Sequence, residues 1–310
     1  KMKKHGFGVD AGGTTWKIGF FENSGNMLDK WEIKTNTENH GASILDDIVA
    51  SLESKLADAG ISKDEVEGVG IGVPGPVKND SVVCECVNLG WGTFDVAETL
   101  SEKIGLPVKV GNDANVAALG EMWKGGGRGY DSIVMVTLGT GVGGGVILQG
   151  KILTGCKGAG GEIGHMKVNM DETRVCGCGN KGCLEQYASA TGIVNMAKEN
   201  VPEGSYLADK KVTAKAVFDG AKEGDAYCME VVEKFGRYLG VALSNVAHVV
   251  DPEAFVIGGG VSAAGQILLD VVEKYYNENS MFALKNKSFH LAELGNDAGI
   301  YGAVRMVLFK

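Results

Sequence analysis

The sequence lacks the excess of basic residues that a nucleic-acid-binding surface requires. Its 310 residues include 30 Lys and Arg against 39 Asp and Glu, which gives a net charge of −9. The basic residues are scattered along the chain rather than massed in one place. Because a protein must neutralise phosphates to hold a nucleic acid, this balance predicts that nucleic acid is not a main partner.

Long hydrophobic runs are also absent. No stretch approaches the ~18 consecutive apolar residues of a transmembrane helix. The first residues, KMKKHGFGVDAGG, carry positive charge but no apolar run of signal-peptide length. The seven cysteines are an odd number spread over a large chain, which fits reduced thiols better than a disulfide framework. We therefore expect a cytoplasmic protein that is not bound to a membrane.

Glycine is abundant, and short apolar runs that end in glycines alternate with longer helical patterns. Strand, glycine turn and strand are predicted over residues 6–28 and again over 132–153, while strand, turn and helix are predicted over 107–123 and 254–272. When the first strand pair is laid over the second, Val9 falls on Val136 and Gly12 on Gly139. A duplicated βαβ architecture explains this match, although two glycine hairpins could arise independently.

A long helix is predicted between Ser43 and Gly60. Ser43 and Asp46 form a capping-box-like start, apolar residues recur at helical spacing after it, and Gly60 supplies the stop. The length of the chain predicts about two domains.

The glycine turns carry the first candidate chemistry. In DAGGTT, Gly12 and Gly13 permit a tight turn whose backbone N–H groups can approach an anion, and Thr14 and Thr15 add hydroxyl donors. An ordinary β-turn is the alternative for one such segment, but TLGTGVGGG and VIGGGVSAAG repeat the pattern. Asp10 stands at the end of its strand, where a carboxylate can hold a phosphate-bound Mg²⁺.

The cysteines carry the second candidate chemistry. Cys176, Cys178 and Cys183 follow His165 closely, and these four residues offer a tetrahedral set of three sulfurs and one nitrogen that suits a structural Zn²⁺. Unrelated buried thiols or a redox pair are the alternatives. Cys84 and Cys86 lie on an apparent strand and have no nearby partner in sequence, so we interpret them as ordinary strand residues.

Together, VDAGGTTWKIG, VGNDANVAALGE, VTLGTGVGGGV, GAGGEIGHM, CGCGNKGCLEQYAS and VIGGG resemble the ROK family (repressor, open reading frame, kinase) over essentially the whole chain. Within the family, CVNLGWG and GGEIGH are most similar to bacterial glucokinases. The resemblance implies an α/β, two-domain actin-like ATPase fold of the sugar kinase/Hsp70/actin superfamily, with a duplicated βαβ core and an interdomain cleft. We expect a small domain over residues 1–115, completed by a C-terminal helix at about 297–310, and a larger domain with the zinc loop over 116–296.

The resemblance also implies a role for each motif residue. His165, Cys176, Cys178 and Cys183 match the zinc ligands of the family. The residues expected to contact the hexose are Asn88, Asn112, Asp113, Glu162, His165 and Glu185. Taken singly, Glu162 could be a surface or helix-start carboxylate, and Glu185 could be a charge favoured at a helix N-terminus.

Asp113 is the expected catalytic residue. A carboxylate can orient a sugar hydroxyl and accept its proton while the γ-phosphoryl group is transferred. On spacing alone, helix N-capping by Asp113 is an equal alternative, and the family match favours catalysis. The residues expected to bind Mg-ATP are Asp10, Gly12, Gly13, Thr14, Thr15, Thr137, Gly139, Thr140, Gly141, Gly258, Gly259 and Gly260.

These expectations describe an ATP-dependent hexokinase that converts glucose to glucose 6-phosphate, with Mg²⁺ and a structural Zn²⁺. Fructose, mannose, N-acetylmannosamine or allose as the sugar, and polyphosphate as the donor, are alternatives. A non-catalytic sugar-sensing regulator is a further alternative. Family regulators carry a DNA-binding helix-turn-helix ahead of the kinase-like domain, and here the phosphate hairpin begins at Gly8, so we expect no such segment. Family members are commonly dimers or tetramers, so we expect a homodimer or homotetramer.

Overall fold

The computed structural model describes residues 3–12 and 14–309. It divides into two compact units, one made of Lys1–Gly129, Gly145–Gly160 and Asn296–Lys310, and the other of Tyr130–Gly144 and Gly161–Gly295. The domain boundary expected between residues 115 and 116 stays a prediction. The C-terminal residues return to the first unit.

The first unit is built on a sheet with strand order β3-β2-β1-β4-β8. Its strands are β1 (His5–Ala11), β2 (Thr15–Glu22), β3 (Met27–Lys34), β4 (Val66–Val73) and β8 (Val108–Asn112). A separate small sheet of the same unit holds β5 (Val77–Lys78), β6 (Val82–Val83) and β7 (Phe94–Asp95). Its helices are α1 (Glu38–Gly41), α2 (Ile44–Ala59), α3 (Val96–Ile104), α4 (Asp113–Lys124) and α10 (Ala298–Leu308). Strands β1 and β2 are antiparallel, whereas β1, β4 and β8 run parallel.

The other large sheet, called the second sheet below, has the strand order β11-β10-β9-β12-β13. Its strands are β9 (Ile133–Leu138), β10 (Val142–Leu148), β11 (Lys151–Ile152), β12 (Ala254–Gly258) and β13 (Ser288–Leu291). The helices of the second unit are α5 (Glu185–Ala188), α6 (Ala190–Lys198), α7 (Ala214–Lys222), α8 (Ala226–Val250) and α9 (Gln266–Asn279). The two sheets have the same strand order, element for element, so the predicted duplication is confirmed.

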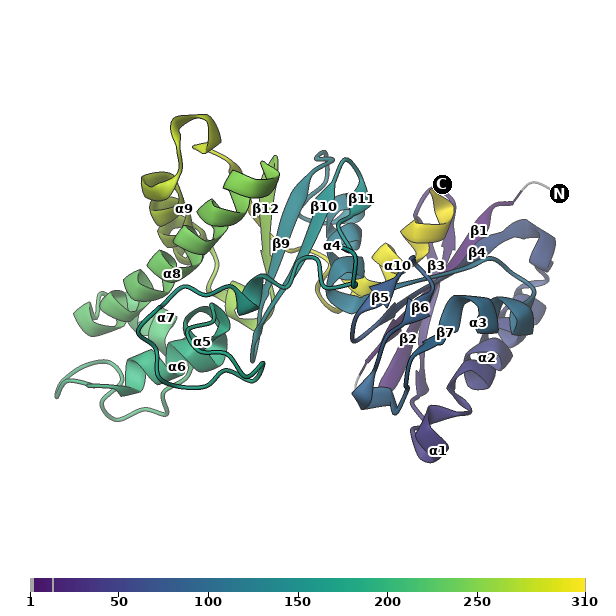
Figure 1. Cartoon of the computed structure of the whole chain (residues 1–310), viewed down its shortest axis with the longest axis horizontal. Coiled ribbons are helices and arrows are strands. Elements are labelled where there is room, and N and C mark those ends of the chain that lie inside the picture. Colours follow the sequence, from purple (N-terminus) through teal and green to yellow (C-terminus); the bar gives the residue numbers. More distant parts are fainter. Residues whose placement is uncertain (1–2, 13, 310) are drawn as a thin grey trace. The chain divides into compact units, whose positions relative to one another are not determined.

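Alternating side chains of the first sheet fill cores on its two faces. Phe20 belongs to the core under α2 and α3, whereas its neighbour Phe21 packs with Ile300 and Val304 of α10. Figure 1 shows α2 and α3 on one face of this sheet and α10 (yellow) on the other.

Helix α10 approaches the first sheet closely because two strand positions carry no side chain. A Cβ on Gly8 would lie 2.0 Å from the carbonyl oxygen of Ile300, and one on Gly70 would lie 1.7 Å from that of Ala303. Real Cβ atoms do not come so near to backbone oxygens, so these glycines fix the helix against β1 and β4.

Two local predictions were wrong. Ser43 precedes α2 but makes no capping hydrogen bond, because its backbone is already helical and its hydroxyl donates to Asp47 instead. Cys84 and Cys86 do not lie on a strand, since β6 ends at Val83 and Cys86 makes only an isolated bridge to Trp91.

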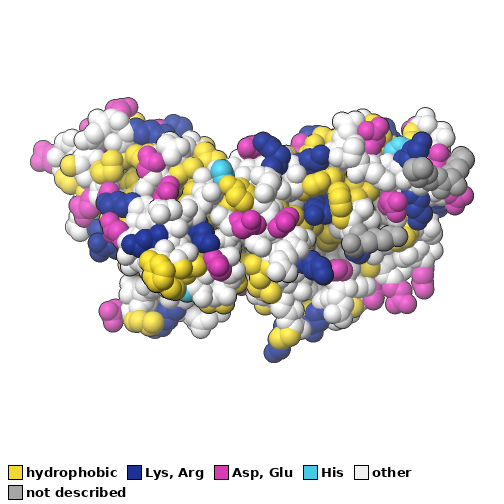
Figure 2. Space-filling model, turned by 90° about the horizontal axis from the view of Figure 1, so that it is seen from above, with side chains coloured by type: hydrophobic (Ala, Val, Ile, Leu, Met, Phe, Trp, Pro, Cys, Tyr) yellow, Lys and Arg dark blue, Asp and Glu magenta, His cyan; other side chains and the backbone are white. Residues whose placement is uncertain are grey.

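The surface agrees with the charge balance of the sequence. Figure 2 shows basic and acidic side chains interspersed on the visible face, without a massed basic area. Among the described residues, no helix combines the length and the apolar character needed to span a bilayer.

Candidate active site

The predicted catalytic and metal-anchoring carboxylates of the first unit lie at the carboxyl ends of parallel strands. Asp10 on β1 pairs in register with Gly72 on β4, and Asn112 at the end of β8 pairs with Val73. Asp113 follows directly as the first residue of α4. Ligands of α/β sheets bind at this edge, because the strand ends and helix starts converge there.

Asp10 sits in a confined environment. Burial raises the pKa of its carboxyl to about 6, the Asp113 carboxylate adds to this effect, and Lys17 opposes it. A Cβ on Gly299, in the first turn of α10, would lie 2.4 Å from the Asp10 Cγ. The absence of a side chain at Gly299 therefore makes room for the Asp10 carboxylate.

The capping role considered for Asp113 belongs to its neighbour. The Asn112 side-chain oxygen accepts a hydrogen bond from the Asn115 N–H at 3.2 Å, and its Nδ2 donates to the Gly75 carbonyl at 3.1 Å. Asn112 is therefore the N-cap of α4, and its amide holds the helix start that presents Asp113. The Asp113 carboxylate accepts from the N–H of Ala114 at 2.8 Å.

Asn88 is exposed, in a short 3₁₀ helix over Val87–Leu89. Burial raises the pKa of the nearby Cys86 thiol, and the Asp113 carboxylate adds to this effect. Asn112 and Asp113 are adjacent at the start of α4, and Asn88 belongs to the same unit.

The first glycine turn joins β1 and β2. The N–H of Gly12 donates to the Thr15 carbonyl at 2.8 Å, and Thr14 is exposed. The Thr15 hydroxyl donates to Glu32 at 3.1 Å, toward the neighbouring strand β3. Gly13 lies outside the described residues.

The other two glycine turns meet within the second unit. Thr137 on β9 pairs with Gly258 on β12, so the segments that follow these strands start side by side. Gly259 has a left-handed φ of 82°, and a Cβ on it would lie 2.5 Å from the Leu138 carbonyl oxygen. Only glycine fits this contact between the two turns.

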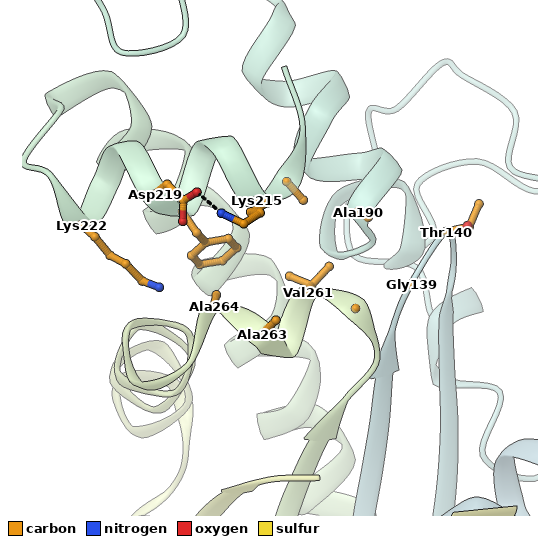
Figure 3. A pocket seen from close by; sticks show the side chains of 12 residues that line it. Gly139, Thr140, Ala190, Lys215, Asp219, Lys222, Val261, Ala263 and Ala264 are labelled. Atoms are coloured by element: carbon orange, nitrogen blue, oxygen red, sulfur yellow. Dashed lines mark hydrogen bonds and ion pairs between the residues drawn. The ribbon is translucent and has the colours of Figure 1, made fainter. Parts of the chain in front are cut away.

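A cavity of about 580 Å³ opens beside these turns, and its lining includes Gly139, Thr140 and Gly260. Figure 3 shows Lys215, Asp219 and Lys222 extending from α7 on one side, with Val261, Ala263 and Ala264 opposite. Lys215 forms an ion pair with Asp219 at 2.5 Å.

Sequence reasoning missed the contribution of α7 to this cavity, which includes Phe218. Nothing in the local pattern of α7 marks it as part of a site. The sequence signal for this cavity was the third glycine turn itself, whose small residues Ala263 and Ala264 line the side opposite α7.

The predicted metal ligands form one cluster. One ligand atom from each of His165, Cys176, Cys178 and Cys183 lies within 4.8 Å of all the others. The Cys178 and Cys183 sulfurs are 3.6 Å apart, and the Cys176 sulfur is 3.8 Å from His165 Nδ1. Tetrahedral zinc with Zn–S bonds of about 2.3 Å separates its sulfurs by about 3.8 Å, so the spacing fits this ion.

The segment His165–Cys183, called the metal loop below, lies against α5, where Glu185 links it to the second glycine turn. Glu185 Oε1 lies 3.2 Å from the Cys176 sulfur and 4.0 Å from His165 Nδ1, while Oε2 accepts from the Val142 N–H at 3.3 Å. A Cβ on Gly141 would lie 2.5 Å from that Oε2. A predicted sugar ligand, the metal cluster and a predicted phosphate turn are therefore contiguous.

Glu162 stands just before the 3₁₀ helix Ile163–His165 and is exposed. It makes no capping hydrogen bond to that helix. Glu162 therefore precedes the metal loop by three positions, while His165 begins that loop and Glu185 begins α5.

The chain matches the description "ROK family" over residues 6–310. The chain belongs to the ROK family. A glucokinase from Halalkalibacterium halodurans is 45% identical over 304 residues, which cover 95% of this chain and 92% of the relative. The Thermotoga maritima glucokinase is 36% identical over 310 residues, covering 97% and 96% of the two chains.

A solved structure of a ROK family glucokinase from Streptomyces griseus, in complex with glucose and AMPPNP, matches with a TM-score of 0.71 and 33% identity. The match covers 98% of this chain and 99% of the other. The actin-like ATPase fold expected from the family motifs is therefore confirmed.

Proposed function

We propose that this protein is an ATP-dependent glucokinase, which transfers the γ-phosphoryl group of ATP to glucose and forms glucose 6-phosphate. One structural observation carries the proposal: Glu185 contacts both the metal cluster and the N–H of Val142 in the second glycine turn. A carboxylate suited to sugar hydroxyls is thereby placed beside a turn suited to phosphate. The similarity to glucokinases supports glucose as the sugar.

Asp113 would act as the general base. Asp113 is the first residue of α4, and the Asn112 cap fixes this helix start. The Asp113 carboxylate therefore lies at the carboxyl edge of the first sheet. This carboxylate would accept the proton of the sugar hydroxyl as the hydroxyl oxygen attacks the γ-phosphorus. No covalent enzyme intermediate is required.

The hexose would be bound by Asn88, Asn112 and Asp113 of the first unit and by Glu162, His165 and Glu185 of the second. Carboxylates and amides suit this task because each can accept from or donate to neighbouring hydroxyls. His165 turns Nδ1 toward the metal cluster, which leaves Nε2 for a sugar hydroxyl.

The donor nucleotide would use the three glycine turns. The phosphates would be held by Gly12–Thr15 and by Gly139–Gly141. The nucleoside site would be lined by Thr137 and Gly258–Gly260, beside the cavity of about 580 Å³. Bound Mg²⁺ neutralises phosphate charge in such reactions. Asp10, whose carboxylate lies at the carboxyl end of β1, would anchor this ion through water.

His165, Cys176, Cys178 and Cys183 would hold a structural zinc. The donor set fits zinc in ligand type and spacing, and four protein ligands leave no open position for a reacting water. When bound, zinc supplies cross-linking of the metal loop and no acid–base chemistry. The loop would in turn orient His165 and Glu185 for the sugar.

A coupled assay tests the function directly. The purified chain is given ATP with glucose, fructose, mannose, N-acetylmannosamine or allose, and then glucose with polyphosphate in place of ATP. We expect the highest kcat/KM for glucose with ATP. A tenfold preference for another hexose or for polyphosphate would reassign the substrate, and sugar binding without ADP formation would indicate a sensor.

We also propose a cytoplasmic homodimer or homotetramer. The cytoplasm supplies ATP and keeps the cluster thiols reduced. Light scattering coupled to size-exclusion chromatography measures the assembly state, and a monomer at micromolar concentration would contradict this part of the proposal.

A further inference from the structure

Beside Glu185 on α5, the side-chain amide of Gln186 joins the two limbs of the metal loop. Its Oε1 accepts from the N–H groups of Gly182 at 2.8 Å and Cys183 at 3.0 Å. Its Nε2 donates to the Arg174 carbonyl at 3.1 Å. One limb thus carries the ligand Cys183 itself, and the other lies two residues before the ligand Cys176.

The turn at Gly182 depends on a geometry that other residues cannot adopt. Gly182 has a left-handed φ of 76°, and a Cβ there would lie 1.9 Å from the Asn169 carbonyl oxygen. Its own carbonyl accepts from Val168 at 2.8 Å. Gly182 and Cys183 are buried, so without the Gln186 oxygen their N–H groups would lose a partner away from solvent, which is costly.

The next residue on α5 fastens the same loop at a separate point. The Tyr187 hydroxyl donates to Glu172, and the other Glu172 oxygen accepts from the N–H groups of Thr173 and Arg174, each at 2.9 Å. The Tyr187 hydroxyl also accepts from the Asn169 Nδ2 at 2.9 Å. This contact therefore holds the Arg174 limb and Asn169, but not the N–H groups of Gly182 and Cys183. Backbone bonding joins the two limbs at the Val175–Lys181 bridge and from the Cys176 N–H to the Asn180 carbonyl at 2.7 Å. Gln186 adds a side-chain bridge from the Arg174 carbonyl to the N–H groups of Gly182 and Cys183.

We propose that Gln186 is a positioning residue that holds the metal loop in the form in which its four ligands converge. This inference rests on the proposed structural zinc. Groups that hydrogen-bond around metal ligands typically change metal affinity or activity by about 10- to 100-fold when they are removed. Because Gln186 touches no ligand atom and no substrate group, its effect would pass through the backbone of the loop.

The test measures zinc release from the purified full chain to a chromophoric chelator in excess. Gln186→Leu keeps the approximate size of the side chain and removes all three hydrogen bonds. We expect it to release zinc about 10- to 100-fold faster than the wild type. The KM for glucose should rise while kcat at saturating glucose stays within about threefold, since Asp113 lies outside the metal loop.

Three further variants sharpen the result. Gln186→Glu keeps an acceptor for the two N–H groups and loses the donor to Arg174, so its release rate should lie between those of the wild type and Gln186→Leu. Tyr187→Phe removes the contacts with Glu172 and Asn169 but leaves the N–H groups of Gly182 and Cys183 bonded, so it should have a smaller effect than Gln186→Leu. Gln266→Ala removes an amide that bonds Asp270 on α9 and should release zinc at the wild-type rate.

The outcomes separate this inference from the proposal beneath it. Zinc release from Gln186→Leu within twofold of the wild type overturns the role of Gln186 and leaves the zinc site intact. A wild-type protein purified without zinc, and unable to bind it, overturns both. If Gln186→Leu does not fold, the release rate of Gln186→Glu decides by the same twofold limit.

Discussion

The two sheets share one strand order, yet they differ in what connects their strands. In the first sheet, α1 and α2 fill the connection from β3 to β4. In the second, the connection from β11 to β12 runs from residue 153 to 253 and contains the metal loop and α5 to α8. The duplicated frame therefore repeats the backbone, and the long second connection adds the metal site and the α7 wall of the cavity.

The comparison extends to the chemistry of the sheet edges. Both sheets place a glycine turn after the first strand, but only the first follows its last parallel strand with the pair Asn112 and Asp113. A glycine turn needs only backbone, so duplication preserves it, whereas a base needs one side chain in one place. The predictions below test this division of roles.

The largest effect is expected at Asp113. Asp113→Ala should lower kcat by about 10²- to 10⁴-fold, because the positioned base is lost, while glucose still binds through its other contacts. Steady-state kinetics and isothermal titration with glucose measure the two quantities. Asp64→Asn, an exposed carboxyl of the same unit, is the control. Turnover within a few-fold of wild type for Asp113→Ala would remove the assignment.

The metal loop should matter to sugar rather than to nucleotide. Cys178→Ser should abolish zinc binding and weaken glucose binding by about 10- to 100-fold, since the loop that carries His165 and leads to Glu185 loses its cross-link. Binding of AMPPNP should persist, because the glycine turns are separate. Metal analysis and titrations provide the readouts, with Cys84→Ser as control. Full glucose affinity in a zinc-free protein would refute this view.

A third test concerns the ion held by the first unit. Asp10→Ala should raise the Mg²⁺ concentration for half-maximal turnover by about 10- to 100-fold, because the water-mediated anchor is removed. The zinc content should not change, since the metal loop belongs to the other unit. Magnesium titrations in the coupled glucose-phosphorylation assay measure this concentration. An unaltered Mg²⁺ dependence would take Asp10 out of the site.

A smaller effect is expected from filling the space that Gly299 leaves beside Asp10. Gly299→Ala would place a Cβ 2.4 Å from the Asp10 carboxyl carbon, and such overpacking typically costs about 1–3 kcal/mol of unfolding free energy. Turnover should fall as the carboxylate is displaced. Gly92→Ala, where a Cβ meets no atom within 4 Å, is the matched control in the same unit. Equal urea-denaturation midpoints for both variants would contradict the expectation.

The smallest effect compares the corresponding helices α2 and α8. Asp225 caps α8 through the Cys228 N–H at 2.8 Å, whereas Ser43 makes no cap on α2. Asp225→Ala should cost about 0.5–2 kcal/mol of unfolding free energy, and Ser43→Ala less than about 0.5 kcal/mol. Urea denaturation at pH 7 measures both. Equal losses would contradict the difference between the two helix starts.

The Asp225 cap also gives a pH signature. Burial would raise the pKa of its carboxyl, but hydrogen bonds from Tyr206 and Cys228 outweigh burial and lower the pKa to about 2. The stability that it contributes is therefore present above its ordinary pKa of 3.8 and is lost as the pH falls toward 2. Asp225→Asn, which can still cap, should lose this part of the acid dependence.

Much of the fold followed from local sequence pattern. The apolar runs that end in glycines predicted β1, β2, β9 and β10, and the spacing of Cys176, Cys178 and Cys183 after His165 predicted a cluster that the structure forms. These features are local because turn geometry and ligand spacing depend on residues close together in the chain. Periodicity and turn chemistry encode such features directly.

Tertiary structure decided which side chain meets which partner. Spacing alone left capping and catalysis equally open for Asp113. In the structure Asn112 caps α4, and its amide also donates to the Gly75 carbonyl. Neither the place of α7 beside the glycine turns nor the bridge from Gln186 to Arg174 has a local signature. Such contacts depend on how distant segments pack, and a periodic pattern specifies the buried face of an element but not the neighbour that covers it.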